Sequence, residues 1–111
     1  MPDVQGVRDG AEVTTTPLDH ELKCWPVYFQ AIWNRSKKFE LRRYDRTFLV
    51  GDIIKLREYV PSASNNGVGI YSGRSIVIKV TYLLLGGIFG LDADYCILSF
   101  TVKQRRLGDC R

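Results

Sequence analysis

Residues 35–46 read RSKKFELRRYDR, and they form the most distinctive stretch of the chain. Six of these twelve residues are Lys or Arg, and two are acidic. Because side chains alternate along a β-strand, Phe39 and Leu41 would point to one side, and Lys38, Glu40 and Arg42 to the other. The pattern predicts an amphipathic strand with one strongly charged face. The alternative is the solvated face of an ordinary strand.

The composition of the chain describes a small globular protein. Its 111 residues suit a single domain, and 45% of them are hydrophobic and 25% charged. A net charge of +4 weakly favours a polyanionic partner. Cys24, Cys96 and Cys110 are widely spaced and His20 is the one histidine, so neither a disulfide framework nor a metal or cofactor site is expected. This cysteine usage suggests a reducing, cytoplasmic location.

Both ends of the chain differ from its middle. Residues 1–19 are polar and include three consecutive threonines, which predicts a flexible N-terminal leader. Residues 103–111 suggest a frayed basic C-terminal tail, so the folded domain should span residues 20–102. The longest apolar run, residues 81–91, is interrupted by three glycines and is shorter than the roughly 20 residues of a membrane-spanning helix, so no membrane association is expected.

Five strands and one early helix are expected between these ends. A helix should begin at Pro26 and end near Asn34, because proline suits the first helical turn and asparagine the last. Apolar alternation and β-branched residues place strands within 20–24, 35–46, 53–59, 75–85 and 95–102, with a loop at 61–69 and a turn at 86–94. The predicted class is α+β, a small and mostly antiparallel β-barrel partly closed by the helix.

The predicted strand 53–59 contains an acidic residue in an unusual place. Alternation puts Ile54, Leu56 and Glu58 on one face, and Lys55, Arg57 and Tyr59 on the other. Burial of an unpaired carboxylate is costly, so Glu58 should lie at the barrel mouth or pair with a base. The alternative is that Glu58 follows the end of the strand, in solvent.

Several short motifs together resemble the ASCH domains (activating signal cointegrator homology) of the PUA-like superfamily. They are the pattern Lys37-x-x-Glu40-x-Arg42 and the segments HELK at 20–23, VGD at 50–52, LREY at 56–59, YSGR at 71–74 and LS at 98–99. The similarity covers residues 20–102 and is greatest to small bacterial and phage members of uncharacterised function. The family pattern G-x-K-x-x-E-x-R has glycine where this chain has Arg35, so Asn34 or Arg35 would have to form the helix-ending turn.

The resemblance implies a PUA-like barrel with a cleft beside the helix that binds RNA or a modified nucleotide. Phosphate contacts would come from five basic residues: Arg35, Lys37, Arg42, Arg43 and Arg46. Glu40 and an aromatic residue would contact a base, with Trp25, Tyr28, Tyr44, Tyr59 and Tyr71 as candidates and Tyr71 the one favoured. Lys23, Asp45 and Glu58 would support the site. Binding of this kind should weaken strongly with salt.

Other interpretations of the same residues stay open. Some ASCH-like proteins remove an acyl group from modified cytidine and carry a threonine at the position of Glu40, and another branch is reported to cleave RNA. If the chain were such a hydrolase, Lys37 and Glu40 would be catalytic, with Glu40 as a general base. A third possibility is a module whose basic face binds an acidic protein. Glu40 and Arg42 could also form a purely structural pair at the helix-to-strand junction.

Overall fold

The computed structural model describes residues 17–62 and 67–108. One helix and five strands follow one another along the chain: β1 (His20–Cys24), α1 (Pro26–Trp33), β2 (Phe39–Arg43), β3 (Ile53–Val60), β4 (Ile70–Leu85) and β5 (Tyr95–Arg106). Most of the leader expected at 1–19 lies outside the described residues. Its last residue, Asp19, is held to the start of β3, because Asp19 N donates to Ile53 O and Ile53 N donates to Asp19 Oδ2, both at 2.8 Å.

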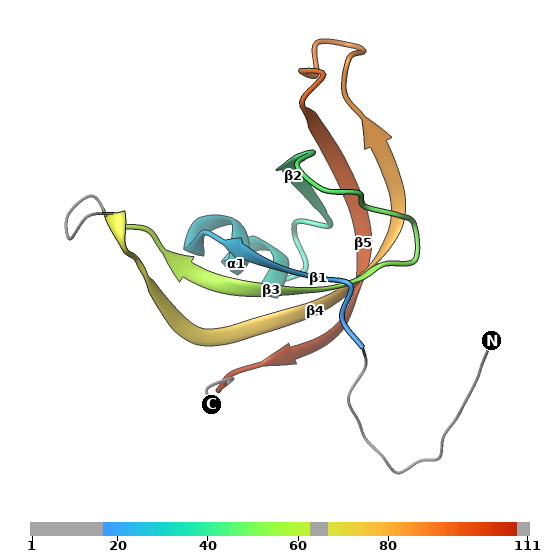
Figure 1. Ribbon diagram of the computed structural model, residues 1–111. Helices are drawn as coiled ribbons and strands as arrows, with labels where there is room; N and C mark the ends of the chain where they lie inside the picture. The colour runs from blue at the N-terminus through green and yellow to red at the C-terminus, as the bar shows by residue number, and fades with distance from the viewer. Residues whose placement is uncertain (1–16, 63–66, 109–111) are drawn as a thin grey trace, which may run out of the picture.

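All five strands belong to one curled sheet in the order β1-β3-β4-β5-β2 (Figure 1). The β3–β4, β4–β5 and β5–β2 pairs are antiparallel, whereas β1 and β3 run parallel. A parallel pair needs a crossover connection, and α1 and β2 provide it. The fold is therefore mostly sheet with one short helix, as expected, and three of its four strand pairs are antiparallel, as expected. The sheet is nevertheless mixed, because β1 and β3 run parallel, and it forms a curled half-barrel instead of a barrel.

Irregularities in the strand pairing accompany the curl of the sheet. The register of β4 against β5 shifts between Val77 and Ile78 and again between Val80 and Tyr82, and that of β3 against β4 shifts between Arg57 and Tyr59. Such bulges bend and twist strands locally. Beyond the core, β4 and β5 continue as a hairpin that projects from the rest of the molecule (Figure 1).

Both long strands exceed the lengths predicted for them. β4 begins at Ile70 and not at Ser75, because Tyr71 and Ile70 pair with Tyr59 and Val60 of β3. β5 runs to Arg106, where it pairs with Ser75. The basic residues Lys103, Arg105 and Arg106 thus lie in a strand, and the expectation of a tail that frays from residue 103 is wrong for them. Residues 109–111 are outside the described part.

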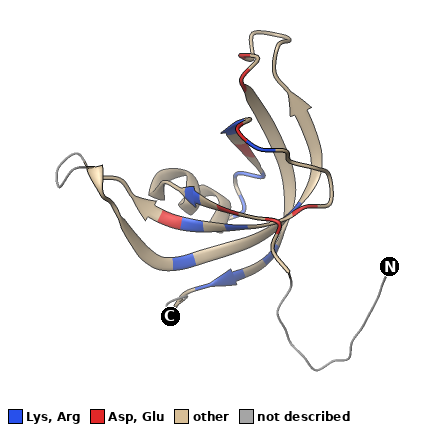
Figure 2. Ribbon diagram, in the orientation of Figure 1, with Lys and Arg blue, Asp and Glu red and all other residues tan. Residues whose placement is uncertain are grey.

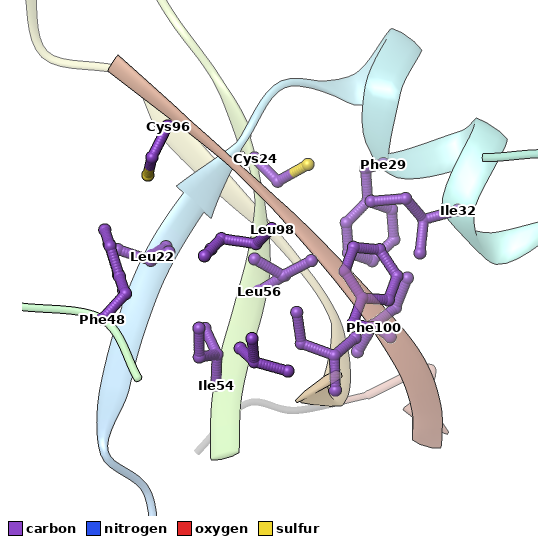
Figure 3. Packing of buried hydrophobic residues seen from close by; sticks show 13 residues of the cluster. Leu22, Cys24, Phe29, Ile32, Phe48, Ile54, Leu56, Cys96, Leu98 and Phe100 are labelled. Atoms are coloured by element: carbon purple, nitrogen blue, oxygen red, sulfur yellow. The ribbon is translucent and has the colours of Figure 1, made fainter. Parts of the chain in front are cut away.

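The hydrophobic core lies between α1 and the inner face of the sheet (Figure 3). Phe29 and Ile32 of α1 are completely buried, as are inward side chains on the central strands: Ile54, Leu56, Ile76, Ile78 and Leu98. Full burial of one such side chain contributes about 1.5–3 kcal/mol. The inward row Ile54, Leu56 and Glu58 follows the predicted alternation of β3. No helix within residues 17–62 and 67–108 is long and apolar enough to cross a membrane.

Candidate functional site

The charged strand β2 turns its charged side inward. The alternation predicted from the sequence is present, but Glu40 is only 4% exposed whereas Phe39 and Leu41 are 46% and 52% exposed. Lys38 lies just before the strand and is exposed. The interpretation of β2 as an ordinary solvated strand face is therefore wrong, because its central acid is buried and must have partners.

Two cations hold the buried carboxylate of Glu40. Lys37 Nζ donates to Glu40 Oε1 at 3.0 Å, and Arg42 Nη1 donates to Oε2 at 2.9 Å. Lys37 Nζ also donates to the carbonyl of Phe39 at 2.7 Å. All three charged members of the motif Lys37-x-x-Glu40-x-Arg42 thus form one group, which we call the charged triad. The pair of Glu40 and Arg42 considered from the sequence is part of it.

The charged triad also joins the two ends of the sheet. β1 and β2 are the outermost strands in the sheet order, and no ladder pairs them among the residues described. Arg42 Nη1 nevertheless donates to the carbonyl of Lys23, in β1, at 2.8 Å. The guanidinium of Arg42 therefore joins the two edges of the half-barrel. The charged triad lies where β1 and β2 would pair with each other if the barrel were closed.

A left-handed residue sets the position of Lys37. Arg35 has φ +74°, in agreement with the expectation that Asn34 or Arg35 forms the helix-ending turn. Arg35 N donates to Ile32 O and Lys37 N to Ala31 O, both at 3.0 Å, so the chain folds back over the last turn of α1. Glycine would adopt this conformation without strain.

A cleft of about 570 Å³ opens between the two sheet edges, and we call it the edge cleft. It is lined by the charged triad, by two residues of β1, by four aromatic side chains and by one leucine. These residues are Lys23, Cys24, Trp25, Tyr28, Lys37, Phe39, Glu40, Leu41, Arg42 and Tyr95. Trp25 and Tyr28 are stacked at 6.5 Å between ring centroids. Lys37 Nζ lies 5.5 Å from the ring centroid of Tyr28 and 4.7 Å from that of Phe39. The edge cleft thus combines apolar rings with a charged wall.

Cys24 lines this cleft, and its thiol could in principle act as a nucleophile, but the thiol is held in its neutral form. Burial, and next the negative charge of Glu40, raise the pKa of the Cys24 thiol to about 12. The thiolate is the reactive form of cysteine, so Cys24 is inert as a nucleophile near neutral pH. Among the described residues no cluster of three or more His, Cys, Asp or Glu side chains could hold a metal ion.

Glu58 belongs to a second buried group, away from the edge cleft. Arg74 Nε donates to its Oε1 at 2.9 Å and Arg74 Nη2 to its Oε2 at 3.1 Å, while Ser72 Oγ donates to Oε1 at 2.6 Å. The pKa of Glu58 is lowered, mainly by the hydrogen bonds that Arg74 donates to its carboxylate. The prediction that Glu58 is paired with a base is confirmed, and the alternative position in solvent is wrong.

Arg74 connects this second group to the helix. Its Nη2 donates to Gln30 Oε1 at 2.9 Å, and its guanidinium carbon lies 4.8 Å from the ring centroid of Trp33 and 5.0 Å from that of Phe29. The sequence motif at 71–74 contained Arg74, but nothing in the sequence indicated its partner. We interpret the Glu58–Arg74 pair as the attachment of α1 to β3 and β4.

Besides the aromatic candidates Trp25 and Tyr28, the edge cleft brings together four charged residues that the sequence suggested for the site: Lys23, Lys37, Glu40 and Arg42. The others do not line it: Arg35, Arg43, Asp45, Arg46, Glu58 and Tyr71. Asp45 and Arg46 form their own exposed pair at 3.3 Å. Arg35 borders a smaller hollow of about 220 Å³ beside Lys37.

Four cleft residues were not predicted from the sequence: Cys24, Phe39, Leu41 and Tyr95. Alternation gave no signal for Phe39, because it places Phe39 on the strand face opposite to Glu40, and Tyr95 comes to the cleft only because β5 pairs Tyr95 with Arg43 of β2. Of the aromatic candidates, Trp25 and Tyr28 line the cleft, while Tyr44 packs near Phe48 at 6.2 Å between ring centroids.

Comparison with known families places the chain in a wider group. The family described as "Domain of unknown function (DUF3850)" matches residues 19–100. The chain belongs to this family. The match contains every residue of the edge cleft, from Lys23 to Tyr95, and both buried ion-pair groups.

A phage protein is similar to this DUF3850 chain over most of its length. It is the "Uncharacterized 12.9 kDa protein in GpA 3′region" of Escherichia phage P2, which is 30% identical over 95 residues that cover 76% of each chain. The expectation of a small domain of phage or bacterial type is thereby confirmed.

Proposed function

We propose that this DUF3850 domain binds nucleic acid, RNA or a modified nucleotide, by seating an unpaired base in the edge cleft. The observation that carries the proposal is a cleft of about 570 Å³ with aromatic walls and a charged triad on one side. Pockets of this size accommodate small ligands, and aromatic rings beside hydrogen-bonding groups are the usual means of holding an unstacked base.

We also infer that the domain is related to the ASCH domains of the PUA-like superfamily. Three features support this relationship: the motif Lys37-x-x-Glu40-x-Arg42 acts as one unit, the turn before it is left-handed, and a cleft lies beside the helix. The resemblance implied the cleft beside the helix and, through the glycine of the family pattern, the helix-ending turn, whereas the contacts within the charged triad come from the structure. The half-barrel would then be the DUF3850 variant of the PUA-like barrel.

The geometry of the triad favours recognition of a base over binding of phosphate alone. Glu40 compensates one of the two cations, so the triad has a net charge of about +1 instead of +2. Arg42 uses Nη1 for Glu40 and for Lys23 O, which leaves donors of its guanidinium for a ligand. A mononucleotide should therefore bind with only weak salt dependence, in contrast to the strong dependence expected from the basic sequence.

The same geometry gives less support to a hydrolase. Both carboxylate oxygens of Glu40 already accept hydrogen bonds from cations, so a water molecule to be activated would have to share an oxygen with Lys37 or Arg42. The Cys24 thiol is held neutral as well. A buried, oriented and doubly paired acid is suited to positioning a ligand.

Calorimetric titration with nucleosides and the four nucleoside 5′-monophosphates, including acylated cytidine, tests the proposal. Tyr28→Ala is the decisive variant, because Tyr28 is 49% exposed and lines the edge cleft, so its removal should leave the fold intact. We expect a loss of affinity of about tenfold, since stacking of one base on an aromatic ring contributes about 1–3 kcal/mol.

Tyr82→Ala is the matched control, because Tyr82 is 62% exposed and is not a cleft residue. It should bind like the wild type. The proposal fails if neither nucleosides nor nucleotides bind to the wild type, or if Tyr28→Ala binds as tightly as the wild type does. Chromatography of the ligands after incubation would detect deacylated or cleaved products and would then favour the hydrolase.

A further inference from the structure

A cluster of cations and aromatic rings lies on the outer face of the sheet, the face turned away from α1. It consists of Lys23 on β1, Arg57 and Tyr59 on β3, and Tyr71 on β4. Lys23 Nζ lies 4.5 Å from the ring centroid of Tyr59, and the guanidinium carbon of Arg57 lies 3.7 Å from that of Tyr71. The two tyrosine rings meet edge to face at 5.1 Å. We call these four residues the outer cluster.

The outer cluster is held in place by the fold and does not depend on a ligand. Lys23 and Arg57 are register partners, as are Tyr59 and Tyr71. Gly69 N donates to Tyr59 Oη at 2.7 Å, and this hydrogen bond holds the ring in place. The backbone packs closely against the ring, because a side chain at Gly69 would collide with it. A preorganised set of rings loses little side-chain freedom when a partner binds.

The outer cluster also touches the proposed base site. Lys23 is an exposed residue that lines the edge cleft, and its ammonium lies over Tyr59. None of the carboxylates in the described part of the chain is paired with Lys23. A single nucleic-acid strand that leaves the edge cleft past Lys23 would meet Tyr59 and then Tyr71.

Basic residues extend this face across the sheet. Arg57 is the register partner of Ser75, which in turn is the register partner of Arg106, so Arg57 and Arg106 lie on the same side of the sheet, with the completely buried Ser75 on the strand between them. Lys55 lies two residues before Arg57 on the same strand. Glu21, which pairs with Arg57 at 2.9 Å, is the acidic residue beside them. Figure 2 marks the backbone positions of Lys and Arg on β3 and near the end of β5.

We propose that the outer cluster guides the backbone and neighbouring bases of a single-stranded nucleic acid whose anchoring base occupies the edge cleft. This proposal rests on the function proposed above and identifies the ligand as a strand instead of a free nucleotide. Tyr71 is 37% exposed and Tyr59 is partly exposed, so both offer ring surface to unpaired bases of any sequence, and nearby cations can compensate the phosphates between these bases. Lys23 belongs both to this cluster and to the edge cleft, so a strand whose base occupies the cleft would reach the outer cluster directly, and for this reason we favour a nucleic acid over an acidic peptide.

A comparison of ligand lengths tests the proposal. The affinities of an RNA octamer of random sequence and of the four nucleoside 5′-monophosphates are measured for the wild type, Tyr71→Ala and Tyr82→Ala at several salt concentrations. Tyr71 and Tyr82 are both exposed tyrosines on β4, but only Tyr71 belongs to the outer cluster. We expect the octamer to bind at least tenfold more tightly than any monophosphate, and Tyr71→Ala to remove most of this gain without changing the affinity for monophosphates.

The salt dependence provides a second readout. Each phosphate that the outer face compensates should add about −0.7 to the slope of log affinity against log salt for a single strand. The octamer should therefore show a steeper slope than a monophosphate. Photochemical crosslinking of an octamer that contains 5-iodouridine, with the adduct mapped by mass spectrometry, should identify Tyr59 or Tyr71 without any substitution.

Three results would overturn the proposal. If octamer and monophosphates bind equally well, the edge cleft functions alone and the base-binding function survives. If Tyr71→Ala weakens both ligands equally, or if adducts form only at residues outside the outer cluster, the outer face does not guide the strand. If neither ligand binds while poly-glutamate binds in a Tyr71-dependent way, both proposals fail and the partner is an acidic protein.

Discussion

Glu40 combines burial with two charge-assisted hydrogen bonds, and this combination makes it sensitive to substitution. Replacement by glutamine keeps the shape of the side chain but leaves Lys37 and Arg42 without their counter-charge. Hydrogen bonds to charged groups contribute about 1.5–3 kcal/mol each, and part of that energy would be recovered by solvent around the two cations. We expect Glu40→Gln to lower the free energy of unfolding by about 2 kcal/mol, measured by urea denaturation.

Asp45→Asn serves as the control for this prediction. Asp45 is an exposed acid of the same charged stretch and pairs with Arg46 at 3.3 Å. Exposed pairs contribute only about 0–1 kcal/mol, so the midpoint of Asp45→Asn should stay close to that of the wild type. Equal midpoints for Glu40→Gln and the wild type would show that the charged triad does not stabilise the fold.

Glu58 should give the protein a measurable acid sensitivity. Its pKa is lowered in the folded state, first by hydrogen bonds from Arg74, so the folded state stabilises the charged form. A carboxylate of this kind contributes stability that is complete above its unfolded-state pKa and is lost as the pH falls through the folded-state value. The stability difference between wild type and Glu58→Gln should therefore be largest near neutral pH and shrink as the pH falls below about 4.

Urea denaturation of both proteins between pH 7 and pH 3 would measure this difference. The wild type should approach the variant at the acid end, since the protonated acid and the amide resemble each other in charge. A constant difference over the whole range would contradict the assignment of Glu58 as the acid that Arg74 stabilises.

The end of α1 depends on a residue with an unfavourable conformation. Arg35 has φ +74°, a conformation that costs an L-residue about 1–2 kcal/mol, whereas glycine adopts it freely but loses about 0.5–1 kcal/mol of chain entropy. We expect Arg35→Gly to stabilise the protein by about 0.5 kcal/mol and to raise its Tm by about 2–4 °C. Asn34→Gly, at a residue with φ −79°, should lower the Tm instead, and scanning calorimetry distinguishes the two. A lower Tm for Arg35→Gly would mean that other contacts of the Arg35 side chain outweigh the strain.

The helix and the starts of most strands could be predicted because they depend on local rules. Pro26 begins α1, the alternation of Ile54, Leu56 and Glu58 is that of β3, and the charged stretch does form β2. The direction in which β2 faces could not be predicted. Alternation places Phe39 opposite Glu40 but does not say which side is buried, and here the partners Lys37 and Arg42 allow the acid to face inward.

Features that depend on long-range pairing were beyond the sequence pattern. The extension of β5 to Arg106 requires its register partner Ser75, and the position of Tyr95 in the edge cleft requires the pairing of β5 with β2. The partner of Glu58 was foreseen as a base, but its identity as Arg74 depends on how β3 and β4 align. Residues of the site were thus predictable by type, and their assembly was not.

At the scale of the whole molecule, the half-barrel is an open sheet whose two edges are joined by side chains. Arg42 connects β2 to the Lys23 carbonyl of β1, and the edge cleft lies at that junction. A backbone ladder between these edges would leave less room for a ligand. We infer that the charged triad holds the sheet edges together while the cleft between them stays open.

Arg42→Met tests this inference, because methionine keeps an apolar stem of similar length but has no donor for Glu40 or Lys23 O. Edge strands open more easily than central strands. The backbone amides of β1 and β2 should therefore exchange with deuterium about tenfold faster in the variant than in the wild type. The amides in the middle of β4 should keep their wild-type exchange rates. Mass spectrometry of peptic peptides after deuterium labelling measures both sets.

Uniformly faster exchange would indicate global destabilisation, and unchanged exchange in β1 and β2 would show that the core alone holds the edges. Arg43→Met, which changes an exposed neighbour on the same strand, should exchange like the wild type at both edges.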